Sequence, residues 1–327
     1  MYIALSHGDE NQTTEDLIKL RLTEVFVRSI VLQFMSNIQE LQHAILYTLT
    51  YADVFDYPLN APEIHRYLTG VKASQEDMEC ALKKLTHEVG YDGRYYFLAG
   101  REAIVKVRIN RAQVASQLWK KAILYGHVIA SLPFVRMVTV TGSLAMDNTD
   151  EGKDIDYMIV TAKGYLWTCR AMSLIITRIA RLNGVTLCPN YLVTENALKL
   201  EEHSLYVARE LAQMIPLSGM EVYAQIRCLN SWVNEYLPNS QGAPKLPADI
   251  NPPQVPFLFQ RLMEFVLKIL PTRLFERWEM NRKVTKLSRE QGSSPEAKFT
   301  ADICKGHVDR HGQKTEIAIR EKLEQIF

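Results

Sequence analysis

Apolar residues recur at helical spacing through the first ninety positions of this chain of 327 residues. The pattern predicts one long helix and then three shorter ones, over residues 14–40, 41–55, 60–70 and 74–89. An Asp-Gly turn at residues 92–93 precedes an aromatic strand, which is typical of a hairpin. Three helices followed by a hairpin predict an N-terminal winged-helix-like domain.

The last of these short helices has an acidic surface. It carries two lysines, Lys83 and Lys84, against four acidic residues, which are Glu76, Asp77, Glu79 and Glu88. Because proteins bind duplex DNA by neutralising its phosphates with Lys and Arg, we expect this domain not to bind duplex DNA. We interpret it instead as a packing or substrate-gating module.

The middle of the chain interleaves strand and helix patterns. Helical spacing covers residues 103–131, 165–182, 204–215 and 220–237, and strand-like apolar runs cover residues 134–142, 154–161 and 186–194. We therefore predict an α+β fold.

The C-terminal part begins with a linker rich in Pro and polar residues and continues as helices. The first of these helices is apolar except for one stripe, which is made by Gln260, Arg261, Glu264 and Lys268. We interpret it as buried against the rest of the protein or against a second subunit, which allows a homo-oligomer through the C-terminal helices. Contact with a membrane surface is the second interpretation. The predicted regions are residues 1–38 (N-terminal helix), 39–102 (winged-helix-like domain), 103–237 (central domain) and 238–327 (linker and helical region).

Composition narrows the picture only a little. The formal net charge of +1 and the hydrophobic content of 47% are those of an ordinary soluble protein and give no argument for a nucleic-acid partner. The five cysteines are scattered, odd in number and without a CxxC pair, which favours a reducing, cytoplasmic setting over a disulfide framework or a zinc site. The N-terminus turns acidic before any apolar core, and we expect neither a signal peptide nor a membrane span.

Candidate chemistry is concentrated between residues 141 and 161. Gly142 and Ser143 follow an apolar strand, and a glycine there lets the backbone approach a phosphate while the serine offers an N–H and a hydroxyl. Asp154 and Asp156 open the next strand two positions apart, so both side chains point to one face. Two carboxylates on one face can hold hard cations such as Mg²⁺, which also bind phosphate oxygens.

This arrangement resembles the DNA-polymerase-β-like nucleotidyltransferase superfamily, whose signature is an apolar strand, Gly-Ser, a loop and Asp-x-Asp. Gly142, Ser143, Asp154 and Asp156 match that signature, with a ten-residue loop between the two pairs. The resemblance covers residues 103–237. It implies a small mixed sheet flanked by helices, Mg²⁺ or Mn²⁺ as cofactor, and transfer of a nucleoside monophosphate from an NTP to an acceptor hydroxyl with release of pyrophosphate.

Two positions depart from the family pattern. Many small members carry an arginine just after Gly-Ser, whereas residues 144–146 here are Leu-Ala-Met, so cations for the triphosphate would come from Lys121, Lys153, Lys163 or Arg170. The family also places a third carboxylate on the following strand as metal ligand and base. The matching residue here is Asn190, a neutral amide, and Glu195 just past that strand is the candidate substitute.

Three hypotheses follow. The first is an enzyme, a nucleotidyltransferase whose acceptor is a small molecule, a protein or RNA. The second is a nucleotide-binding regulator, or an inactive relative, that has lost the third carboxylate. The third is a winged-helix nucleic-acid-binding protein with an inert appended domain. A C-terminal tail that folds back to bring Lys305 or His307 to the nucleotide site is a further expectation.

Overall fold

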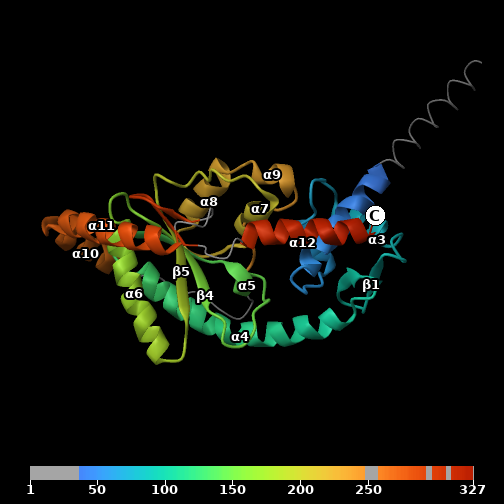
Figure 1. Ribbon diagram of the computed structural model, residues 1–327, viewed down its shortest axis with the longest axis horizontal. Helices are drawn as coiled ribbons and strands as arrows, with labels where there is room; N and C mark the ends of the chain where they lie inside the picture. Colours follow the sequence, from blue (N-terminus) through green and yellow to red (C-terminus); the bar gives the residue numbers. More distant parts are fainter. Residues whose placement is uncertain (1–36, 247–256, 292–296, 307–310, 327) are drawn as a thin grey trace, which may run out of the picture.

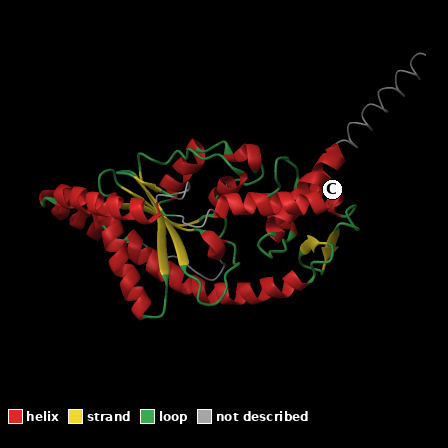
Figure 2. Cartoon of the chain, viewed as in Figure 1, coloured by secondary structure: helices red, strands yellow, loops and turns green. Residues whose placement is uncertain are grey.

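The computed structural model describes residues 37–246, 257–291, 297–306 and 311–326. Within these residues a mixed sheet has helices on both faces, and a group of helices lies apart from it on the N-terminal side (Figures 1 and 2). The predicted α+β class is confirmed. Most of the helix predicted for residues 14–40 lies outside the described residues, as do His307 and part of the predicted linker.

The N-terminal module, residues 37–102, contains the predicted helices and hairpin. Its elements are a helix over residues 37–53, α2 (Ala61–Arg66), α3 (Gln75–Leu82), β1 (Val89–Tyr91) and β2 (Tyr96–Leu98). The Ser74 hydroxyl accepts a hydrogen bond from the Asp77 backbone N–H at 3.1 Å, which satisfies one of the unpaired donors at the start of α3. The side chains of Glu76 and Asp77 are exposed on that helix.

One long helix, α4 (Ala103–Ala130), joins the module to the sheet (Figure 1). Near its start the buried Arg108 guanidinium forms hydrogen bonds at 2.7 and 2.8 Å with the Glu63 carboxylate of the module. Near its end Trp119 and Ile123 are buried in the core that covers one face of the sheet. The same rigid helix is therefore fixed at both ends, which sets the position of the module relative to the sheet.

The sheet has the order β6-β3-β4-β5-β8-β7, and only β4 and β5 are parallel. Side chains alternate between its two faces, as they must along a strand. On β4, Tyr157 and Ile159 pack with α4 and α6, whereas Met158 and Val160 pack with α7 and α8. The elements are β3 (Val135–Val140), β4 (Ile155–Thr161), β5 (Leu187–Thr194), α6 (Leu166–Leu182), α7 (Leu205–Gln213) and α8 (Met220–Leu229).

Three strands lie where the sequence pattern predicts none. β6 (Ile215–Ser218) begins where the predicted helix 204–215 ends, because Pro216 disfavours helical backbone at the residue before it. Because β6 is an edge strand of the sheet, the missing N–H of Pro216 is tolerated there. β7 (Lys298–Phe299) and β8 (Ile303–Lys305) are too short to show a period in the sequence. The predicted helix 220–237 is divided into α8 and α9 (Val233–Tyr236).

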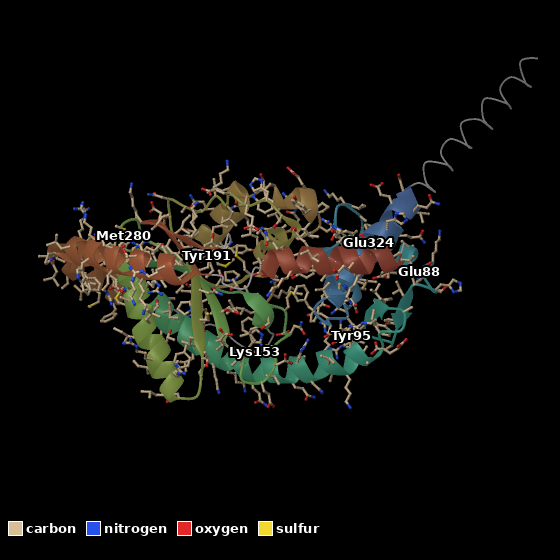
Figure 3. All side chains as sticks on the ribbon, in the orientation of Figure 1. Glu88, Tyr95, Lys153, Tyr191, Met280 and Glu324 are labelled. Carbon is tan, nitrogen blue, oxygen red and sulfur yellow. The ribbon has the colours of Figure 1, made fainter. Side chains whose placement is uncertain are left out.

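The C-terminal helices lie at two places. α10 (Phe257–Ile269) and α11 (Thr272–Gln291) form a pair at one end of the long axis, near Met280 in Figure 3, while Glu88 of the N-terminal module lies toward the other end. α12 (His311–Ile326) runs back beside α7 toward the module, where Lys322 pairs with Asp53 (Figure 1). In the described part of the chain, no helix combines the length and the apolar character needed to cross a membrane.

Candidate functional site

A cavity of about 830 Å³ lies between the N-terminal module, the start of β4 and helix α7. The module contributes an aromatic wall, which includes Tyr51, Phe55 and Tyr57. The sheet and the turns beside it contribute polar side chains from the predicted site, which are Ser143, Lys153, Asp154, Asp156 and Asn190. An aromatic wall facing a polar floor is a common construction for sites that hold a small molecule with a charged end.

The Gly-Ser turn packs directly against the second aspartate. Gly142 has φ +66°, and a Cβ built on it would lie 2.5 Å from Asp156 Oδ2, so glycine is required both by the backbone conformation and by the space. The backbone N–H of Thr141 donates to the Asp156 carbonyl at 3.0 Å. The turn, α5 (Gly142–Ala145), buries Leu144 and leaves Ser143 at the cavity.

Asp154 and Asp156 face the cavity together, as their spacing predicts. Asp156 has the same orientation as Met158, toward α7, and Asp154 lies just before the strand begins. Carboxylate oxygens of both residues and Cys188 Sγ lie within 4.8 Å of one another. Burial, and then the charges of Asp154 and Glu210, raise the pKa of Asp156 to about 7.

A bulge in β5 brings two further side chains to these carboxylates. The pairing shifts where Cys188 lies opposite Asp156 and Tyr191 opposite Met158, so β5 advances three residues while β4 advances two. Pro189 lies in this irregular part, where a missing N–H disrupts no ladder. Asn190 Nδ2 donates to Asp156 Oδ1 at 2.9 Å, and burial together with the two aspartates raises the pKa of the Cys188 thiol.

Glu195 does not reach this site. Its backbone N–H donates to the carbonyl of Thr161 at 3.0 Å, which places it at the far end of β4 from Asp154. Its carboxylate lies 3.7 Å from Arg136 and does not line the cavity. The expectation that Glu195 replaces a third carboxylate fails because β5 continues, fully extended, from Asn190 to Thr194 before this residue.

A different carboxylate lies in the cavity. Glu210 extends from α7 toward the start of β4, and its charge contributes to the raised pKa of Asp156. Burial raises the pKa of Glu210 itself to about 7, although Lys305 acts to lower it. One feature of the amino-acid pattern points to this residue, since Arg209 and Glu210 are charged neighbours in a helix whose other sides are largely apolar.

Basic side chains line the cavity from several directions. Lys153 comes from the loop before β4, and its position near the centre of the molecule is visible in Figure 3. Lys298 and Lys305 come from the β7–β8 hairpin, where they pair with Glu201 at 2.7 Å and Glu202 at 3.4 Å. Lys305 therefore reaches the cavity by the route predicted for the C-terminal tail.

Arg170 lies elsewhere. It belongs to α6, on the face of the sheet opposite to α7, with its guanidinium 5.8 Å from the Trp167 ring and close to Cys304. Lys121 and Lys163, the other suggested cations, are likewise absent from the cavity lining. The prediction for Arg170 is wrong because the helix after β4 crosses to the far face, which the sequence pattern alone does not decide.

The loop after Gly-Ser is held by the module, which explains its apolar start. The Tyr57 hydroxyl donates to the Met146 carbonyl at 2.5 Å, and Met146 Sδ lies 3.2 Å from the Tyr67 hydroxyl. On the other side Trp119 Nε1 donates to Asp147 at 2.7 Å. Met146 stands near the position where the nucleotidyltransferase pattern often has an arginine, and here it contacts Tyr57 and Tyr67 of the module.

No protein-family model, curated protein or solved structure matches this chain. The function must therefore be argued from the site itself.

The donor set at the start of β4 fits a hard divalent cation. Asp154 and Asp156 supply carboxylate oxygens, and Asn190 would supply an amide oxygen after a half-turn of its side chain. A thiol is a poor ligand for Mg²⁺. Cys188, with its raised pKa, remains protonated and can donate to the carboxylates. The pKa of Asp156 is raised first by burial and then by the charge of Asp154, and a cation bound between the two carboxylates would offset both effects.

Proposed function

We propose that this chain is a Mg²⁺-dependent nucleotidyltransferase, which moves a nucleoside monophosphate from an NTP to an acceptor hydroxyl. The observation that carries the proposal is the contact between Gly142 and Asp156. The ten-residue loop separates Gly142 from the aspartates in sequence, but the fold brings them together. The Gly142 turn, which lets a phosphate approach the backbone, lies against the Asp154–Asp156 pair, and both line the large cavity. We infer a sheet of the nucleotidyltransferase type from the same elements.

Each group then has a role in holding the substrate. Asp154 and Asp156 would hold Mg²⁺, which neutralises charge on the phosphate oxygens. Ser143 and the backbone beside Gly142 would bind the terminal phosphates, with Lys153 and Lys305 as their cations. The aromatic wall of Tyr51, Phe55 and Tyr57 offers π faces for the nucleoside base or for the acceptor.

The transfer itself needs a proton acceptor. The acceptor oxygen bonds to the α-phosphorus, the bond from that phosphorus to the bridging oxygen breaks, and pyrophosphate leaves. Asn190 cannot take the hydroxyl proton because an amide is not a base at neutral pH. Glu210 is the carboxylate that supports this role, since it lines the cavity and has a pKa of about 7.

A nucleotide-binding regulator is the second candidate. The hydrogen bond from Asn190 to Asp156 favours it, because an amide there leaves the cation with one fewer negative ligand than the resemblance implies. Changing Asn190→Asp separates the two candidates. In a regulator that has lost only this group the change creates pyrophosphate release, whereas in an enzyme that uses Glu210 it alters an existing rate by less than about tenfold.

The decisive test is calorimetry of NTP binding with and without Mg²⁺, together with release of pyrophosphate from labelled NTPs in the presence of RNA or cell extract as acceptor. We expect Mg²⁺-dependent binding that is lost in the double variant Asp154→Ala, Asp156→Ala. Asp150→Ala is the matched control, because Asp150 is half-exposed, pairs with Arg111 and does not line the cavity. Undiminished Mg²⁺-dependent binding in the double variant would remove the site assignment.

A further inference from the structure

The α10–α11 pair is turned with Gln260 and Glu264 of the polar stripe toward the protein and with large apolar side chains toward solvent. Leu258, Leu262, Phe265 and Ile269 are exposed, with Leu258 at 85% and Ile269 at 71%. Exposed apolar side chains continue through Leu270 in the connecting turn to Leu274 and Trp278 of α11. Soluble proteins rarely leave so many large apolar side chains together in water unless something covers them. We call these seven residues the apolar surface.

Buried polar contacts fix this orientation. Gln260 Nε2 donates to the carbonyls of Leu132 and Val135 at 2.8 and 3.0 Å. Glu264, one turn further on α10, accepts from the Phe134 N–H at 2.8 Å and from Arg136 at 2.7 Å. Because residues four apart lie on one side of a helix, these bonds force the opposite side outward.

A second anchor holds α11 in the same way. The Glu276 carboxylate accepts from the backbone N–H groups of Trp167 and Thr168, at 2.9 and 2.7 Å, and from the Thr168 hydroxyl at 2.7 Å. These N–H groups belong to the first turn of α6, which has no partner of its own for them. The outward direction of the apolar surface is therefore built into the fold and is not a loose packing of the pair.

The charges around the apolar surface have one sign. Glu264 and Glu276 are buried and accept hydrogen bonds from the body of the protein, and the buried Glu279 pairs with Arg282 of the same helix at 2.6 Å. Among the side chains of α10 and α11 whose exposure the structure describes, which leaves out Glu290, the exposed charged ones are basic, and they are Arg261, Lys268, Arg273, Arg277, Arg282, Lys286 and Arg289. Arg282 also lies 5.0 Å from the exposed ring of Trp278.

We propose that the α10–α11 pair is a docking surface for an anionic lipid bilayer. Leu, Phe and Trp side chains on one face, flanked by Lys and Arg, are the combination that lies in the interface of such a membrane. A second copy of this chain suits the surface less well, because two basic surfaces would repel each other as they met. This proposal does not depend on the candidate nucleotide site, which lies at the start of β4, whereas α10 contacts Phe134 and Arg136 beside the end of that strand.

Sedimentation of the full-length protein with vesicles tests the proposal. We expect binding to vesicles of phosphatidylcholine with added phosphatidylglycerol, and at least about tenfold weaker binding to phosphatidylcholine alone. The triple variant Leu262→Asn, Phe265→Asn, Ile269→Asn should lose at least about tenfold in affinity, because it removes apolar area from the interface. Lys268→Gln with Arg273→Gln and Arg277→Gln should lose a similar factor and most of the salt dependence.

Matched controls keep the result specific. Leu182→Asn removes an apolar side chain from α6 that is at least as exposed, and Lys83→Gln with Lys84→Gln removes exposed cations from the turn that follows α3, so both should bind vesicles as the wild type does. Equal binding to both kinds of vesicle, or no binding to either, would overturn the proposal. So would a stable dimer without lipid that the triple variant converts to monomer, since a second copy would then be the occupant.

Discussion

Buried or partly buried carboxylates occur in two regions of this molecule, and their surroundings differ. Under α10, burial acts to raise the pKa of Glu264, but hydrogen bonds from Arg136 and the Phe134 N–H outweigh it, and the pKa lies below its ordinary value. In the cavity, burial raises the pKa values of Asp156 and Glu210 to about 7 without a comparable set of donors. Carboxylates whose pKa is raised in this way, without donors to stabilise the charged form, are typical of functional sites.

The comparison teaches that burial alone does not mark a functional carboxylate. Glu264 and Glu276 satisfy backbone N–H groups that would otherwise lack partners, so they hold the fold together. Asp156 accepts one amide hydrogen bond, and its burial and the neighbouring carboxylate of Asp154 make its charged form unfavourable. Under the proposed function a bound Mg²⁺ would offset this cost. The two regions should therefore respond to substitution with opposite signs in stability.

The largest effect is expected at Glu210. If it takes the acceptor proton, Glu210→Gln should lower kcat by about 10²–10⁴-fold with a small change in KM. The wild-type rate should rise with pH through about 7, since only the ionised carboxylate is a base. Pyrophosphate release measured against pH checks both statements. Glu195→Gln is the control with unchanged rate, and a Glu210→Gln variant of full activity would show that the base lies elsewhere.

The next effect is a gain in stability at Asp156. Its folded pKa of about 7 lies above the ordinary value of 3.8, so the wild type loses stability as pH rises between these values. Asp156→Asn avoids that loss and should be more stable by roughly 2–4 kcal/mol at pH values above 7 in chelator, with the difference shrinking as pH falls. Urea unfolding across this range measures it. Mg²⁺ should stabilise the wild type only, and a less stable variant at high pH would contradict the interpretation.

A somewhat smaller effect of opposite sign is expected at Glu264. Glu264→Ala leaves the Phe134 N–H and the Arg136 guanidinium without their acceptor and should destabilise the protein by about 2–3 kcal/mol. Because the pKa of Glu264 is lowered, its contribution is present above its ordinary pKa and is lost as pH falls through the folded value. Glu201→Ala, which breaks an exposed pair with Lys298, is the control and should change little in the same unfolding measurement.

Local patterns in the sequence predicted most helices and strands, and they predicted that Gly142, Asp154 and Asp156 form the candidate site. Strands and helices with several periods of apolar spacing, such as α4, β4 and α6, lie within a few residues of their predicted bounds, because one buried face constrains many positions at once. Asp154 and Asp156 share a face because a strand alternates every residue, and Gly142 adopts the positive φ that glycine permits. These are consequences of short-range geometry.

Only the tertiary structure decided which distant residues join them. Glu210 and Lys305 reach the cavity because α7 covers one face of the sheet and β8 adds to β5, and neither pairing leaves a periodic signal in the sequence. Arg170 misses it because α6 covers the other face. The amino-acid pattern of α10 predicts two faces of opposite polarity. Which face turns inward was decided by backbone groups of the body, because the Leu132 carbonyl accepts from Gln260 and the Phe134 N–H donates to Glu264. Hydrophobicity alone predicts that the apolar face of α10 turns inward, but the buried hydrogen bonds of its polar side chains turn that face toward solvent.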